Sequence, residues 1–106
     1  MLNCKSEVSK DMEKYYSKEI EQLFEAIISI NDIKTCKSFF DDVCTIKEIQ
    51  DMSQRLEVAR ELRCGKNYQE ISKATGASTA TISRVNKCLL YGSGGYNKVL
   101  GKEETK

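Results

Sequence analysis

The chain has 106 residues, enough for one domain with a modest core, and its 17 basic and 16 acidic residues leave a formal net charge of +1. It contains no Pro, no Trp and no His, and its five cysteines form no C-x-x-C pair, so the commonest general base and the usual zinc-binding spacings are missing. We therefore expect no enzyme and no metal site, but an intracellular chain with reduced thiols. No signal peptide is evident and no apolar run approaches the ~18 residues of a membrane span, so we predict a cytoplasmic protein without membrane contact.

Charge is unevenly distributed along the chain. In residues 1–53 seven Lys oppose eleven acids, whereas in residues 54–106 ten Lys and Arg oppose five acids. Between Arg63 and Lys102 the single acid is Glu70. A polyanion is the simplest partner for such a basic half, although charges that are segregated in sequence need not form a patch after folding.

The N-terminal half is predicted to be helical. After a loose start at residues 1–6, we expect a long helix from about Glu7 to Ile30, because its apolar residues recur at helical spacing. They cover more than one stripe: Met12, Tyr15, Tyr16, Ile20, Leu23, Phe24, Ile27, Ile28 and Ile30. Either this helix is central in the core of one chain, or a second copy packs on it. The second explanation is simpler for a chain of this size, so we predict that residues 7–63 assemble a homodimer.

Two further helices precede the basic half. Asp32 can cap a helix over residues 33–42, and Thr45 with Glu48 has the spacing of a capping box that opens a helix over residues 46–63. The apolar stripe of the latter helix is expected in the core: Ile46, Ile49, Met52, Leu56, Ala59 and Leu62. Its polar side carries charged neighbours that we interpret as a solvated face rather than a site: Arg55, Glu57, Arg60 and Glu61.

Residues 67–91 have the pattern of two short helices joined at a glycine. Asn67 and Glu70 are spaced as a capping box, Gly76 stands where the first helix must stop, and Ser78 is a good N-cap for the second. Apolar positions are expected to face inward: Tyr68, Ile71, Ala74, Ile82, Val85 and Leu89. The outward face of the second helix is small or hydroxyl-bearing at its start and cationic further on: Thr79, Ala80, Ser83, Arg84 and Lys87.

This layout is typical of a DNA-reading helix-turn-helix, whose second helix brings small residues to base edges and cations to phosphates. The cations expected at phosphates are Lys66, Lys73, Arg84 and Lys87. The alternative is a helical corner that only packs, in which case the chain would be a dimeric protein-interaction module with a vestigial motif. Beyond the helix pair, residues 92–95 are expected to form a flexible connection, residues 96–100 one docking turn, and residues 101–106 a flexible polar tail.

The segment Phe39–Leu100 resembles the Trp repressor superfamily, and within it the TrpR-related YerC/YecD branch. The resemblance depends on Gln54–Ala59, on Gly65 and above all on Thr75–Asn86, which reads TGASTATISRVN. It implies a single all-α domain over residues 1–106 that forms an intertwined homodimer and binds double-stranded DNA as a transcriptional regulator of the repressor type. The operator-reading positions of the family fall here on Gln69, Lys73, Ser78, Thr79, Ala80, Thr81 and Ser83.

The resemblance also bears on a corepressor. In the tryptophan-responsive members two arginines enclose the ligand, and Arg55 and Arg84 stand at the matching places, with Thr45 near the ligand's amino group. Where those members have a glycine this chain has Val85, whose branched side chain would fill the space for the indole ring, and Cys88 replaces a hydroxyl. We therefore expect no cofactor and no L-tryptophan. Arg55 and Arg84 could equally be a surface charge and a phosphate contact.

Overall fold

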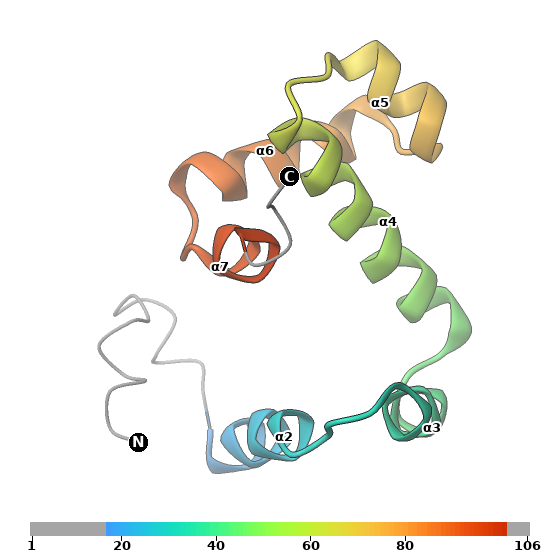
Figure 1. Cartoon of the computed structure of the whole chain (residues 1–106), viewed down its shortest axis with the longest axis vertical. Helices are drawn as coiled ribbons and strands as arrows, with labels where there is room; N and C mark the ends of the chain where they lie inside the picture. Colours follow the sequence, from blue (N-terminus) through green and yellow to red (C-terminus); the bar gives the residue numbers. More distant parts are fainter. Residues whose placement is uncertain (1–16, 102–106) are drawn as a thin grey trace. The chain divides into compact units, whose positions relative to one another are not determined.

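The computed structural model describes residues 17–101, and all regular secondary structure in this range is helical (Figure 1), which confirms the all-α prediction. The helices are α2 (Lys18–Ile28), α3 (Ile33–Val43), α4 (Ile46–Arg63), α5 (Tyr68–Thr75), α6 (Thr79–Tyr91) and α7 (Gly95–Gly101). The chain divides into two compact units, with the boundary between Ile46 and Lys47. Within residues 17–101 no helix is both long enough and apolar enough to cross a bilayer.

The first unit contains α2 and α3, and local capping sets where each begins. Ser17 is extended (φ −92°, ψ 176°) and its hydroxyl accepts a hydrogen bond from the Ile20 N–H at 3.2 Å, so α2 starts at Lys18. The prediction of one uninterrupted helix from Glu7 to Ile30 was therefore wrong at Ser17, because this residue caps a helix instead of continuing one. The part of that prediction over residues 7–16 lies outside the described residues.

The start of α3 agrees with the sequence prediction. The Asp32 carboxylate accepts a hydrogen bond from the Thr35 N–H at 2.9 Å, which caps the helix and lowers the pKa of Asp32. Neither α2 nor α3 contains a buried residue. Large apolar side chains of both helices are instead exposed: Leu23, Phe24, Ile28, Ile33 and Val43.

The second unit has its core between the C-terminal part of α4 and helices α5 to α7. The buried residues are Val58, Ala59, Ile71, Ala77, Ile82, Val85 and Leu100, and Leu56, Leu62, Tyr68, Leu89 and Tyr96 pack against them. Helix α6 contacts both α5 and α7 (Figure 1). The predicted docking turn is α7, whose Leu100 is buried and whose last residue, Gly101, was expected in the tail. Residues 102–106 of that tail lie outside the described range.

The predicted apolar stripe of α4 was wrong at its N-terminal end. Ile46 is 67% exposed and Met52 is 40% exposed, whereas Val58, which the stripe did not include, is 0% exposed. The core uses α4 only from Leu56 onward, so the first turns of the helix carry apolar residues that the core does not cover. Ala74 was predicted to face inward but is exposed. Ala77, on the other side of Gly76, is buried instead.

Candidate nucleic-acid interface

The first helix of the predicted helix pair, α5, is opened by a reciprocal cap. The Glu70 N–H donates to Asn67 Oδ1 at 2.9 Å, and the Asn67 N–H donates to Glu70 Oε1 at 3.0 Å. This is the capping box that the sequence predicted. It satisfies two backbone N–H groups that the helix itself leaves without partners.

The turn between α5 and α6 is built around a left-handed glycine. Gly76 has φ +77° and its N–H donates to the Ser72 carbonyl at 2.9 Å. A Cβ at this position would meet nothing closer than Gln54 Nε2 at 3.9 Å. Glycine is therefore needed for the positive φ and not for lack of space.

Side chains of α5 close the rest of the turn. The Thr75 hydroxyl donates to the Ile71 carbonyl at 2.8 Å and accepts from the Ala77 N–H at 3.1 Å. The Ser72 hydroxyl donates to the Ala77 carbonyl at 2.9 Å. Both backbone polar groups of the buried Ala77 are thus paired within the helix pair, so the geometry of the turn is defined locally.

Helix α6 begins with a hydroxyl cap. Ser78 Oγ accepts from the Thr81 N–H at 3.2 Å and donates to Thr81 Oγ1, also at 3.2 Å. The two hydroxyls are therefore hydrogen-bonded to each other at the start of α6. Thr79 and Ser83 are exposed.

The two faces of α6 have the predicted character. Ile82 and Val85 are buried, whereas the predicted outward residues are exposed: Thr79, Ala80, Ser83, Arg84 and Lys87. Gln69 and Lys73 on α5 are exposed as well. The helix pair thus offers solvent a narrow strip of small and hydroxyl-bearing residues followed by cations.

The four predicted phosphate-binding cations differ in their surroundings. Lys73, Arg84 and Lys87 form no ion pair with any residue in the described range, whereas Lys66 Nζ lies 2.7 Å from Glu61 Oε1. This contact lowers the pKa of Glu61 and raises the pKa of Lys66. The Glu61 side chain is only 16% exposed, so the prediction that it belongs to a solvated face was wrong.

The residues expected near a corepressor lie in both units. Arg55 is half-buried on α4, Arg84 is exposed on α6, and Thr45 is exposed in the first unit. Val85 is 1% exposed and belongs to the hydrophobic core. The space that a glycine at position 85 would leave for an indole ring is therefore filled by the packed side chain of Val85.

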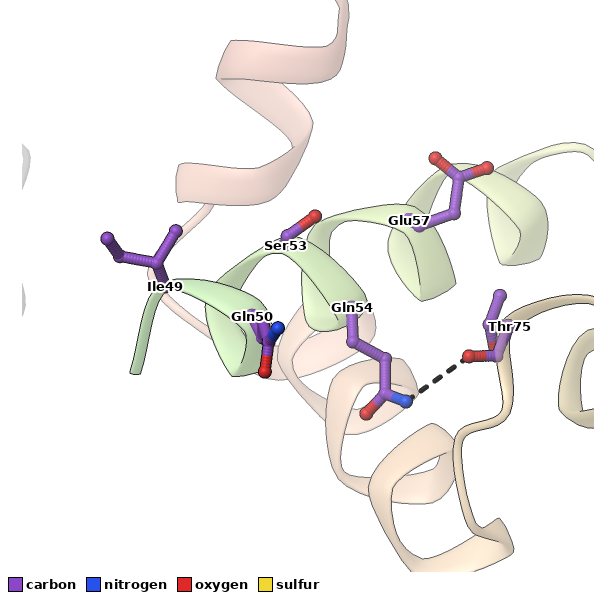
Figure 2. A pocket seen from close by; sticks show the side chains of 6 residues that line it. All are labelled: Ile49, Gln50, Ser53, Gln54, Glu57 and Thr75. Atoms are coloured by element: carbon purple, nitrogen blue, oxygen red, sulfur yellow. Dashed lines mark hydrogen bonds between the residues drawn. The ribbon is translucent and has the colours of Figure 1, made fainter. Parts of the chain in front are cut away.

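Two clefts of the second unit were not foreseen from the sequence. One, of about 400 Å³, lies beside Cys88 and residues 92–95, and its further lining residues are Leu56, Tyr96 and Val99. The other, of about 500 Å³, lies between α4 and the end of α5 and is lined by Ile49, Gln50, Ser53, Gln54, Glu57 and Thr75 (Figure 2). Figure 2 shows the Gln54 side chain reaching from α4 toward Thr75, whose carbonyl accepts a hydrogen bond from Gln54 Nε2 at 3.2 Å.

Comparisons with known proteins agree with this geometry. The family model of the Trp repressor protein matches residues 18–104. The uncharacterized protein YerC of Bacillus subtilis is 54% identical over 91 residues, which cover 86% of this chain and 88% of that protein. The crystal structure of a TrpR-like protein from Eubacterium eligens is 51% identical, with a TM-score of 0.81 over 85% of this chain and 93% of that one.

A fourth comparison is with the crystal structure of a candidate Trp repressor from Staphylococcus aureus. It is 42% identical, with a TM-score of 0.85 over 92% of this chain and 100% of that chain. Both solved structures are therefore similar to this chain in sequence as well as in fold, over most of their length. On these grounds the chain belongs to the Trp repressor family, as a TrpR-related protein similar to YerC.

Proposed function

We propose that this protein is a sequence-specific, DNA-binding transcriptional regulator, a repressor in type, and that α5 and α6 form its helix-turn-helix. The observation that carries the proposal is the exposed strip of α6, where small and hydroxyl-bearing residues precede Arg84 and Lys87. A recognition helix needs small side chains where it approaches base edges and cations where it passes phosphates. Membership of the Trp repressor family supports the same function.

Each side chain of the strip has a role in this proposal. Gln69, Thr79, Ala80 and Thr81 would lie near base edges, and Ser78 would hold the start of α6 in place. Lys73, Ser83, Arg84, Lys87 and, after release from Glu61, Lys66 would contact phosphates. Thr and Ala offer few bidentate contacts to bases, so DNA shape and bridging water would contribute to discrimination. A regulator of this kind works on the chromosome, which places it in the cytoplasm of a bacterial cell.

The proposal includes a homodimer. Helices α2 and α3 bury none of their residues, yet Ile28 is 77% exposed and Ile33 is 72% exposed. Five large apolar side chains are exposed on these two helices, and we take them to form an interaction site. A second copy of the chain is the occupant that also explains the helix-turn-helix, because such readers bind paired half-sites about one helical turn apart.

A gel-shift comparison tests DNA binding. Wild type should retard duplex DNA at low salt, and the double variant Thr79→Asp, Arg84→Glu should not, because it makes the net charge of the strip more negative by three units. The matched control is Ser93→Asp, Lys98→Glu, which changes the net charge equally at two exposed positions outside α2, α3 and the strip and should still bind. If wild type retards no duplex even at low salt, the protein is better explained as a protein-interaction module.

Sedimentation equilibrium tests the dimer. Wild type should sediment with twice the mass of the chain, and Ile28→Glu should sediment as a single chain because a carboxylate cannot be buried in an apolar interface without a partner. Gln22→Glu adds the same carboxylate at an exposed polar position of α2 and should leave the mass unchanged. A wild-type particle with the mass of one chain would contradict the proposal.

No L-tryptophan is needed in this proposal. Val85 is packed in the core, so an indole ring could enter at this position only by displacing it. Calorimetric titration of the wild type with L-tryptophan should therefore give no saturable heat at micromolar concentrations. Saturable heat would show that the ligand binds without the space that a glycine provides.

A further inference from the structure

Within residues 17–101, the turn between α5 and α6 has one hydrogen bond to another helix. Its other hydrogen bonds connect Ser72, Thr75, Gly76 and Ala77 with residues of the pair itself, so they define the turn but not its position on the rest of the protein. The Thr75 carbonyl instead accepts from Gln54 Nε2, across a cleft and from a residue 21 positions away in sequence (Figure 2). This bond relates the turn to α4.

A second polar connection joins α4 to the far end of α6. Arg63 Nη1 donates to Asn97 Oδ1 at 3.0 Å, and Asn97 Nδ2 donates to the Leu89 carbonyl at 3.2 Å. Asn97 belongs to α7, so the amide links the last turn of α4, through α7, to the last turns of α6. Helix α4 is therefore connected directly to the turn before α6 and, through α7, to the last turn of α6.

We infer that these hydrogen bonds fix the angle at which α6 is presented, and that Gln54 is a positioning residue for DNA reading. The inference rests on the proposed function. Between α4 and α6 the core consists of apolar side chains such as Val58, Ala59 and Ile82, whose attraction is not directional. Hydrogen bonds are directional, so they select one angle among the orientations that the core tolerates.

The position of α4 in the chain gives this angle its importance. Helix α4 is the segment that leads from the first unit, which we propose to assemble the dimer, to the unit that carries α6. In a dimer that reads two half-sites, the orientation of each recognition helix on its α4 contributes to the spacing at which both can bind. A small rotation of α6 would then reduce binding to the operator more than binding to any other duplex, because phosphate contacts depend little on sequence.

The test compares Gln54→Met with Gln50→Met. Methionine has nearly the length of glutamine but donates no hydrogen bond, and Gln50 lines the same cleft one turn away without a hydrogen bond to Thr75. The operator is first selected from genomic fragments with the wild-type protein, and the dissociation constants for this duplex and for a scrambled one are then measured at one salt concentration. Urea denaturation identifies any variant that does not fold. If Gln54→Met does not fold, it is replaced by Gln54→Glu, which also lacks the donor to the Thr75 carbonyl, and by Asn97→Leu, which lacks the donor to the Leu89 carbonyl.

We expect Gln54→Met to reduce the ratio of specific to non-specific affinity by about tenfold, the upper range for one neutral hydrogen bond, with non-specific affinity changed less than about twofold. Gln50→Met should leave the ratio unchanged. An unchanged ratio in folded Gln54→Met would overturn the inference, as would an equal loss on both duplexes, which indicates a merely weakened fold.

A second readout does not depend on DNA. Residual dipolar couplings of the free protein report the angle between α4 and α6, and in Gln54→Met this angle should change by more than the roughly 10° that a preorganised site tolerates. An unchanged angle would overturn the inference even if DNA binding were altered. If the wild type selects no sequence at all, the proposed function fails, whereas the angle still decides whether Gln54 positions α6.

Discussion

The salt dependence of DNA binding should distinguish two lysines that look equivalent in the sequence. Lys87 is exposed on α6 and forms no ion pair with the residues of the described range, whereas Lys66 Nζ lies 2.7 Å from Glu61 Oε1. A lysine that is free in the unbound protein brings a full positive charge to a phosphate. A lysine that is already paired brings its acid with it, so the two together add little net charge.

The expected magnitude follows from counterion release. Each phosphate contact contributes about 0.9 to the slope of log affinity against log salt, so Lys87→Gln should lower the slope of a dimer by about 1.8. Between 50 and 200 mM salt this corresponds to about a tenfold smaller loss of affinity. Lys66→Gln should lower the slope by less than half as much, because Glu61 already neutralises the ammonium group.

Fluorescence anisotropy of a labelled duplex, measured at several salt concentrations, gives these slopes directly. Glu61→Gln is the complementary variant: it releases Lys66 and should raise both the affinity and the slope. Equal reductions by Lys66→Gln and Lys87→Gln, together with no effect of Glu61→Gln, would refute the reasoning. That result would mean that the ion pair does not restrain Lys66 in solution.

Three further predictions concern stability. Gly76→Ala should lower the free energy of unfolding by about 1–2 kcal/mol in urea denaturation, because alanine disfavours the positive φ, and Gly76→Asn should lower it less. Ile82→Ala should cost about 2–5 kcal/mol in the same assay, since Ile82 is 0% exposed and its loss leaves a cavity. The Lys66 ammonium lowers the pKa of Glu61 below its usual 4.5, so the stabilisation by this pair is present above that pH and is lost as the pH falls through the lowered pKa. The difference in melting temperature between wild type and Glu61→Gln should therefore shrink in acid; a difference that stays constant would contradict this assignment.

Helix caps were the most predictable features. The capping box of Asn67 with Glu70, the N-caps Asp32 and Ser78 and the left-handed Gly76 all lie where the sequence placed them. A cap joins residues two to four positions apart, so the pattern of residue types carries most of the information. Ser17 was missed although it obeys the same rule, because the apolar periodicity continues through it and favoured an uninterrupted helix.

Burial was predicted well on α6 and less well on α4. The outward and inward faces of α6 follow helical periodicity, whereas Ile46 and Met52 of α4 are exposed and Val58 is buried. Periodicity identifies the apolar side of a helix. It does not indicate how much of that side a neighbouring helix covers, which depends on where the other helices pack.

Side chains that are close in sequence thus specify where these helices begin and end, and residue type indicates which face of α6 is suited to DNA. Only the tertiary structure revealed the contacts that we infer to orient this face: Gln54 with Thr75, 21 residues apart, and Arg63 with Asn97, 34 residues apart. The pairing of Lys66 with Glu61 likewise followed from the turn at Gly65 rather than from helical spacing. The two long-range contacts depend on the packing of several helices at once, and no spacing of residues along one helix encodes them.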